Sequence, residues 1–252
     1  MAKKVHRYDA VIEKVFFDNY KKGAKIVKFD REEFVFAGQF LKMERIKNLG
    51  DIPYTYRFRK ELPESILKTQ KKRMEWLIYS TGQSSYEFRL LPKLDLTPKL
   101  AYDYIELLDS TPGVITKYSF TDEQALLAIL RYNRIIDTFL GITCYSLQNH
   151  LKTSIQGWGS MEVDELYIGV DSDGTYYVIP VEAKGHNDKI GRVQIDQDFA
   201  LCRDKFKGLK CIPVAAQFLG DNKIALFKFD QKNEETLITG EKHYKLVQEE
   251  ER

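Results

Sequence analysis

The spacing of apolar residues predicts two helices at the start of the chain. Between Tyr8 and Tyr20 apolar side chains recur at helical intervals, and Gly23 follows as a plausible stop. A second amphipathic pattern covers residues 30–46, where Asp30 can cap the helix and Glu33 completes a capping box. We therefore expect two consecutive helices, each with one apolar face.

The pattern then changes to an alternation typical of a strand. In residues 52–60, Tyr and Phe side chains alternate with Thr55, Arg57 and Arg59, which predicts a strand with a basic outer face. After the basic cluster Lys68, Lys71, Lys72 and Arg73, residues 74–91 are typical of a β-hairpin that turns within residues 81–85.

Two helices followed by a strand with outward arginines would suit a winged-helix-like unit, because guanidinium groups on a rigid element bind phosphate oxygens. The candidate DNA-binding residues are Arg57, Arg59, Lys71, Lys72 and Arg73. The alternative is an ordinary α+β domain, in which a charged edge strand only prevents aggregation. The sequence leaves both interpretations open.

The rest of the chain alternates between strand-like and helical patterns. A long helix is predicted over residues 120–141, capped by Thr121 or Asp122 and ended by Gly141. Three strands follow, over residues 143–153, 162–170 and 175–184; then come a helix at 190–206 and strands at 211–218 and 223–229. This order predicts an α/β fold with a mixed sheet. We divide the chain into an N-terminal basic region (1–91), a connecting segment (92–121) and a core (122–252).

Composition restricts the class of protein. The chain has 252 residues with 43% hydrophobic content, which allows a large core. Its first residues contain no apolar signal-peptide region, and no run approaches the roughly 18 apolar residues of a membrane span, so we expect a cytoplasmic protein without a membrane partner. Three cysteines without a CxxC pair do not favour a disulfide framework or structural zinc.

The net charge of +2 conceals an uneven distribution along the chain. The first 75 residues contain 19 Lys and Arg against 11 Asp and Glu, whereas the remainder contains 20 against 26. Such asymmetry suggests that the first part faces a polyanion and that the second part clusters carboxylates.

The turn Asp171–Gly174, with the sequence DSDG, is the most informative motif. Asp at the first position and Gly at the fourth are typical of a type I turn with a G1 bulge, which closes a three-residue hairpin loop. If Asp171 pairs with Thr175, then Asp164 lies opposite Glu182, and Glu162 lies opposite Lys184.

Two carboxylates at such a distance repel each other unless a cation or a proton lies between them. A hard divalent ion such as Mg²⁺ meets this need, since it prefers carboxylate oxygens and retains waters for further chemistry. Lys184 beside the ion could hold or help to deprotonate an attacking water and offset charge on a phosphate. Pro180, which cannot donate to a ladder, predicts that the strand is distorted or unpaired on one side just before this patch.

At these residues the chain resembles the PD-(D/E)xK nuclease superfamily, and its type II restriction endonucleases in particular. The matching residues are Asp164 on one strand, the triplet Glu182-Ala183-Lys184 on the next, and Gln194 on the following helix. Val163 stands where the family pattern has Pro, which leaves Glu162 and Asp171 as rival first ligands.

The resemblance covers roughly residues 122–230 and implies a mixed-sheet α/β/α restriction-endonuclease-like core. It implies catalytic roles for Asp164, Glu182, Lys184 and Gln194, with Asp164 and Glu182 binding Mg²⁺ as cofactor. The implied function is cleavage of double-stranded DNA by a homodimer, with a methyltransferase of the same specificity as a possible partner. The alternatives are a DNA-binding protein with a non-catalytic nuclease-like scaffold, and a repair or junction-resolving nuclease.

Overall fold

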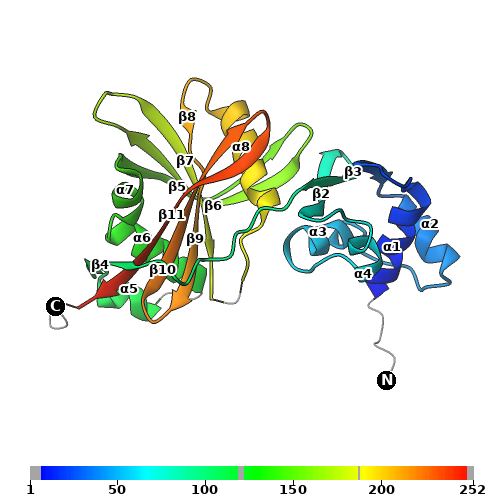
Figure 1. The fold of residues 1–252 in the computed structure, drawn as a ribbon, viewed down its shortest axis with the longest axis horizontal. Helices are drawn as coiled ribbons and strands as arrows, with labels where there is room; N and C mark the ends of the chain where they lie inside the picture. The colour runs from blue at the N-terminus through cyan, green and yellow to red at the C-terminus, as the bar shows by residue number, and fades with distance from the viewer. Residues whose placement is uncertain (1–6, 119–121, 187, 249–252) are drawn as a thin grey trace. The chain divides into compact units, whose positions relative to one another are not determined.

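The chain divides into two compact units in a computed structural model that describes residues 7–118, 122–186 and 188–248 (Figure 1). One unit comprises the chain up to Lys93 together with Ser154–Gly159. The other comprises Leu94–Thr153 and the chain from Ser160 onward. Both are mixtures of helices and strands.

The first unit packs four helices against a three-stranded antiparallel sheet of order β1-β3-β2. Its elements are α1 (Arg7–Asn19), β1 (Ile26–Asp30), α2 (Glu33–Phe40), α3 (Asp51–Phe58), α4 (Glu64–Leu67), β2 (Met74–Gly82) and β3 (Ser85–Pro92). The predicted hairpin of residues 74–91 is therefore confirmed. The first predicted helix is confirmed as well, and its apolar face, with Val11, Ile12, Val15 and Phe16, is buried in the core of this unit.

The second predicted helix forms, but its predicted cap does not. Asp30 ends β1, and α2 begins only at Glu33. The Glu33 carboxylate nevertheless accepts a hydrogen bond of 2.8 Å from the backbone N–H of Asp30, which is one half of a capping box. Asp30, which the sequence pattern predicts as the helix cap, is thus the last residue of the strand β1.

The predicted strand over residues 52–60 is wrong, because this segment forms the helix α3. Ile52, Pro53 and Tyr56 are its buried residues, and their spacing follows a helix rather than an alternating strand. Pro53 lies in the first turn, where its missing N–H costs no helical hydrogen bond. The alternation of aromatic and polar residues over these few positions fits both structures.

The second unit is built on an eight-stranded mixed sheet of order β4-β11-β10-β9-β7-β6-β5, with β8 paired to β7. Its strands are β4 (Tyr104–Leu108), β5 (Thr143–Ile155), β6 (Gly159–Val170), β7 (Tyr176–Lys184), β8 (Lys210–Cys211), β9 (Val214–Gly220), β10 (Lys223–Lys232) and β11 (Glu235–Val247). Three pairs are parallel, namely β4 with β11, β7 with β8 and β7 with β9. The predicted α/β class with a mixed sheet is confirmed.

Helices cover both faces of this sheet (Figure 1). The helices of this unit are α5 (Gly113–Tyr118), α6 (Asp122–Tyr132), α7 (Ile135–Leu140) and α8 (Arg192–Lys205). Leu126, Leu130 and Phe139 of α6 and α7 join one apolar cluster with the sheet. Ile195 and Phe199 of α8 join another. The sheet is therefore a central layer with apolar contacts on both sides.

The helix predicted over residues 120–141 is divided in two. It breaks between α6 and α7 at Arg134, whose backbone is left-handed with a φ of 49°. Gly141 ends α7 in a left-handed conformation, as predicted. The proposed cap Thr121 and the side chain of Asp122 lie outside the described residues.

Two strands of the sheet have no counterpart in the sequence prediction. β4 lies within residues 92–121, which we expected to connect the two regions, and it pairs with β11 at one edge of the sheet. β11 follows the last predicted strand and pairs with β10. In the described part of the chain, no helix has the length and apolar character needed to cross a membrane.

Candidate active site

The hairpin of β6 and β7 has the register that the DSDG turn predicts. The backbone N–H of Asp171 donates to the carbonyl of Thr175 at 3.1 Å, and Gly174 adopts the positive φ of 77° that the turn requires. The antiparallel ladder runs from Val170 opposite Tyr176 to Glu165 opposite Val181. This register directs the next residues of the two strands, Asp164 and Glu182, toward each other.

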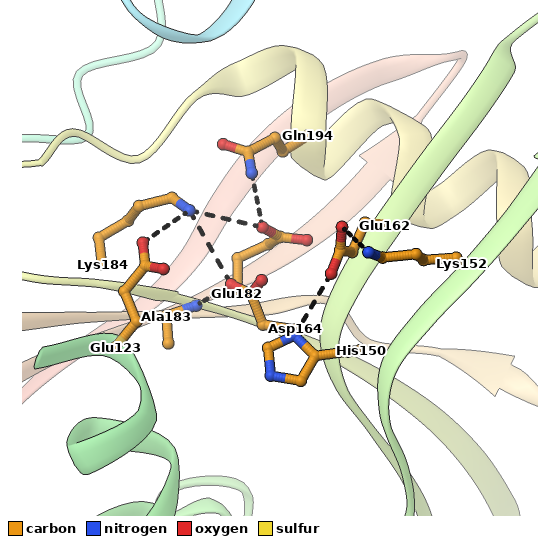
Figure 2. Close-up of polar contacts among 9 residues, drawn as sticks. All are labelled: Glu123, His150, Lys152, Glu162, Asp164, Glu182, Ala183, Lys184 and Gln194. Atoms are coloured by element: carbon orange, nitrogen blue, oxygen red, sulfur yellow. Dashed lines mark hydrogen bonds and ion pairs between the residues drawn. The ribbon is translucent and has the colours of Figure 1, made fainter. Parts of the chain in front are cut away.

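The side chain of Asp164 links β6 to β7 just beyond the last backbone pair of the hairpin. Its Oδ2 atom accepts a hydrogen bond of 2.8 Å from the backbone N–H of Ala183, in the middle of the Glu182-Ala183-Lys184 triplet (Figure 2). The side chain of Asp164 is 17% exposed and that of Glu182 is 1% exposed. One carboxylate is thus accessible from solvent, and the other is buried beside it.

Lys184 ends β7 with its ammonium group among three carboxylates. Its Nζ atom lies 3.6 Å from Glu123 Oε1, 3.9 Å from Asp164 Oδ2 and 3.9 Å from Glu182 Oε2 (Figure 2). Because these distances exceed those of a close ion pair, the ammonium group is shared rather than bound to one partner. Three of the four side chains expected to converge here, Asp164, Glu182 and Lys184, do so, whereas the fourth, Glu162, does not.

Gln194 reaches the same group from the first turn of α8. Its Nε2 atom donates a hydrogen bond of 2.7 Å to Glu182 Oε2 (Figure 2). The sequence analysis singled out Gln194 by resemblance alone, and this contact places it beside the two strand residues. The amide fixes one oxygen of Glu182 and leaves the other, Oε1, buried without a hydrogen-bond partner among the described residues.

Pro180 lies where β7 changes neighbours. On one side β7 pairs with β8 at Tyr177 and Val178 and then with β9 from Val181 onward. In these ladders Pro180 pairs only with Leu166 of β6, on the other side. The prediction that β7 is unpaired on one side just before the site is confirmed, and the missing N–H of proline costs no ladder bond there.

The two rival first ligands lie outside the site. Glu162, expected opposite Lys184, instead contacts His150 Nδ1 at 3.3 Å and Lys152 Nζ at 3.5 Å, and its side chain is 43% exposed (Figure 2). Both predicted pairings lie beyond the β6–β7 ladder, which ends at Glu165 and Val181. The pairing of Glu162 with Lys184 is wrong, because the Glu162 side chain contacts His150 and Lys152 instead.

Asp171 is a structural residue of the turn. Its carboxylate accepts hydrogen bonds from the backbone N–H groups of Asp173 and Thr175 and from the hydroxyl of Tyr177. These bonds, that of Tyr177 first, hold the pKa of Asp171 below its usual value. Asp164 is left as the strand carboxylate that approaches Glu182.

Two acidic residues near the site, Glu123 and Asp198, belong to no motif identified in the sequence. Glu123, in the first turn of α6, contacts Lys184 from a helix that precedes the hairpin by many residues. Asp198, on α8, is fully buried and interacts electrostatically with Glu182. Only Asp198 carried a local signal, because it follows Gln194 by four residues and so lies on the same helical face.

The site is strongly electrostatic. Burial raises the pKa of Glu182 well above its usual value, and the charges of Asp198 and Asp164 raise it further. Burial also raises the pKa of Asp198, with contributions from Cys202 and Asp164. For Lys184, burial favours the neutral amine, yet the charges of Glu182, Asp164 and Glu123 outweigh it and the pKa is raised.

The donor set fits a hard cation with an incomplete protein shell. Within the described residues, no group of three or more His, Cys, Asp and Glu side chains is placed to hold a metal ion. Mg²⁺, however, is usually bound by one or two carboxylates and completes its shell with waters and substrate phosphates. Asp164 and Glu182 supply these two carboxylates, and the Oε1 atom of Glu182 has no hydrogen-bond partner among the described residues.

The candidate DNA-binding residues do not form the surface that was expected. Arg57 lies in α3 instead of on a strand, and burial lowers its pKa. Arg59 follows α3 and stacks over the Tyr54 ring at 4.8 Å. Lys71, Lys72 and Arg73 are exposed in the loop before β2, as a phosphate-binding role requires.

Comparison of the chain with family models, with curated proteins and with solved structures gave no match.

Proposed function

We propose that the protein is a magnesium-dependent endonuclease that hydrolyses phosphodiester bonds of double-stranded DNA. The observation that carries this proposal is the meeting of Asp164, Glu182, Lys184 and Gln194 in one group of contacts. They come from two strands and a helix, and an exposed ion pair would need neither the burial of Glu182 nor the amide of Gln194.

The order of elements around the site supports the same class of protein. The elements follow one another as α6, α7, β5, β6, β7, α8 and β9, with β7 antiparallel to β6 and parallel to β9. A mixed sheet between helices is the core that the resemblance to PD-(D/E)xK nucleases implies. We therefore interpret residues 122–230 as a restriction-endonuclease-like core.

Each side chain has a distinct task in the proposed reaction. Asp164 and Glu182 would hold Mg²⁺, which supplies Lewis acidity toward a phosphate oxygen and activates a bound water. Gln194 keeps the Glu182 carboxylate in orientation through its hydrogen bond. Lys184 carries a positive charge at neutral pH, because its pKa is raised, and it offsets the charge that develops on the phosphate.

The finer assignment is a type II restriction enzyme. A symmetric homodimer would bring two such sites to the two strands of a palindromic target. The exposed Lys71, Lys72 and Arg73 of the first unit would help to hold the DNA backbone. A methyltransferase of the same specificity would protect the host DNA.

The proposal is tested by incubating plasmid and linear duplex DNA with the full chain in Mg²⁺, in Mn²⁺ and in chelator. Cleavage should require the metal and should be abolished in Asp164→Asn. Glu162→Gln is the matched control, because Glu162 lies two residues away on β6 and makes only exposed contacts. Metal-independent cutting, or full activity in Asp164→Asn, would contradict the proposal.

A second candidate is a DNA-binding protein with a non-catalytic nuclease-like scaffold. It is favoured by the lack of a three-residue metal-holding group among the described residues. Under this alternative the wild type would bind duplex DNA but would leave linear, branched and damaged duplexes intact in both metals. Cleavage of branched or damaged duplexes alone would instead indicate a repair or junction-resolving nuclease.

A further inference from the structure

Asp198 is a buried acid without a hydrogen-bond partner in the part of the chain that the structure describes. It lies on α8 with 0% exposure, and neither of its carboxylate oxygens has a hydrogen-bond partner among the described residues. A buried carboxylate in this condition costs free energy, because it has left water without gaining compensating hydrogen bonds. A residue that only stabilised the fold would be expected to have partners.

Its neighbour on the same helix provides the contrast. Asp196 is also buried, with 6% exposure, but Arg192 Nε lies 3.5 Å from its Oδ2 atom and the hydroxyl of Thr236 donates to its Oδ1 atom. The two aspartates are only two residues apart and therefore point to different sides of α8. Burial within this helix is thus compatible with a satisfied carboxylate, and Asp198 is the one left unsatisfied.

The helical position of Asp198 directs it toward the candidate active site. It follows Gln194 by four residues, so the two side chains lie on one face of α8, and Gln194 contacts Glu182. This position brings the Asp198 carboxyl into electrostatic interaction with Glu182.

The charges around Glu182 do not balance. If all four are ionised, Glu123, Asp164, Glu182 and Asp198 supply four negative charges, whereas Lys184 supplies one positive charge. Among the described residues, the two buried acids, Glu182 and Asp198, also have carboxylate oxygens without a hydrogen-bond partner. A divalent cation beside Glu182 would offset the negative charge with its two positive charges, and its waters would donate hydrogen bonds to the unpaired oxygens.

We propose that Asp198 is a positioning residue for the divalent cation, acting from α8 through the waters of the ion and through its charge. This inference rests on the proposed function, because it requires that Asp164 and Glu182 bind the ion. Direct ligation by all three carboxylates is not expected, since the described residues contain no three-member metal-holding group. Groups that orient a metal site from outside its ligand shell typically change metal affinity about 10- to 100-fold when they are removed.

The test measures Mn²⁺ binding to the full chain by calorimetry, and thermal unfolding in chelator, for wild type, Asp198→Asn and Asp196→Asn. We expect Asp198→Asn to melt at a higher temperature than wild type in chelator, because burial disfavours the ionised carboxylate of Asp198 and Asn has no charge to bury or neutralise. The same variant should bind Mn²⁺ about 10-fold or more weakly. Asp196→Asn should melt at a lower temperature and keep wild-type Mn²⁺ affinity, because it loses an ion pair away from the site.

The possible outcomes separate this inference from the proposed function. Wild-type Mn²⁺ affinity in Asp198→Asn would overturn the inference alone and leave the proposed function standing. Absence of Mn²⁺ binding by the wild type would overturn both. Should Asp198→Asn fail to fold, Asp198→Ser takes its place with the same expectation, and failure of both variants to fold would show that Asp198 is a structural residue and overturn the inference.

Discussion

At the scale of single residues, the charge state of Lys184 defines what it can do. Burial alone would favour the neutral amine, but three carboxylates within 4 Å raise the pKa instead. A lysine that keeps its proton at neutral pH is a poor general base and a good electrostatic group. In the proposed reaction Lys184 therefore serves to offset charge and to orient water.

Replacement of Lys184 by Ala should reduce the cleavage rate by about 10²- to 10³-fold, which is typical for loss of an electrostatic group in a protected site. The measurement is single-turnover cleavage of a duplex in Mg²⁺. Lys152→Ala is the matched control, because Lys152 makes its ion pair with Glu162 on an exposed part of the sheet. Equal losses in the two variants would contradict the role of Lys184.

Glu182 predicts a pH dependence of stability in the absence of metal. Its pKa in the folded protein is raised, first by burial, so the folded state favours the protonated form. Its contribution to stability is fully present below the unfolded pKa of about 4.3 and is lost as pH rises toward the folded pKa. Urea unfolding in chelator at several pH values should show this decrease.

The decrease should be smaller in Glu182→Gln, which cannot ionise, and unchanged in the exposed control Glu162→Gln. An identical pH profile for wild type and Glu182→Gln would contradict the assignment of a raised pKa to this residue.

At the scale of elements, the hairpin of β6 and β7 was predictable because its register is encoded locally. The four turn residues Asp171–Gly174 determine the register, and the alternation of side chains along each strand then determines which of them face each other. The helix α3 was not predictable in the same way, because its short alternation of aromatic and polar residues also satisfies a helix. Glu123 was missed because its approach to Lys184 depends on how α6 packs on the sheet, which no local pattern encodes.

The turn itself can be tested through Asp171. Its carboxylate accepts three hydrogen bonds that close the loop, so Asp171→Ala should lower the melting temperature and weaken the alignment of Asp164 with the triplet. Because the pKa of Asp171 is lowered in the folded state, its stabilisation is present above about pH 3.9 and is lost as pH falls further.

Asp173→Ala is the control for this prediction, since Asp173 is an exposed residue of the same turn. Thermal unfolding and duplex cleavage should both be affected in Asp171→Ala and nearly normal in Asp173→Ala. The same effect in both variants would mean that the carboxylate of Asp171 does not determine the register.

At the scale of the whole molecule, charge is divided between the two parts of the chain. The excess of basic residues lies in the first 75 positions, within the first unit, whereas the acidic cluster at Lys184 belongs to the second. The proposed function would use this division, with the first part contacting the DNA backbone and the second binding the metal ion.

The simultaneous replacement of Lys71, Lys72 and Arg73 by Ala should weaken duplex binding equally for all DNA sequences. Each phosphate contact contributes roughly 0.9 to the magnitude of the slope of log K against log salt concentration. If each of the three residues neutralises one phosphate, this magnitude should fall by up to about 2.7. Fluorescence anisotropy at several salt concentrations measures this slope. The matched control replaces Lys205, Lys207 and Lys210, which are exposed residues of the second unit. An unchanged slope in the first variant would exclude a role of this loop in binding phosphates.

The proposed metal site can be tested by anomalous diffraction from crystals of the protein soaked in Mn²⁺. The proposed function predicts an anomalous peak between the carboxylates of Asp164 and Glu182, within about 2.0 to 2.3 Å of an oxygen of each, and no such peak in crystals of Asp164→Asn. Crystals that contain Mn²⁺ elsewhere but have none between these two carboxylates would contradict it.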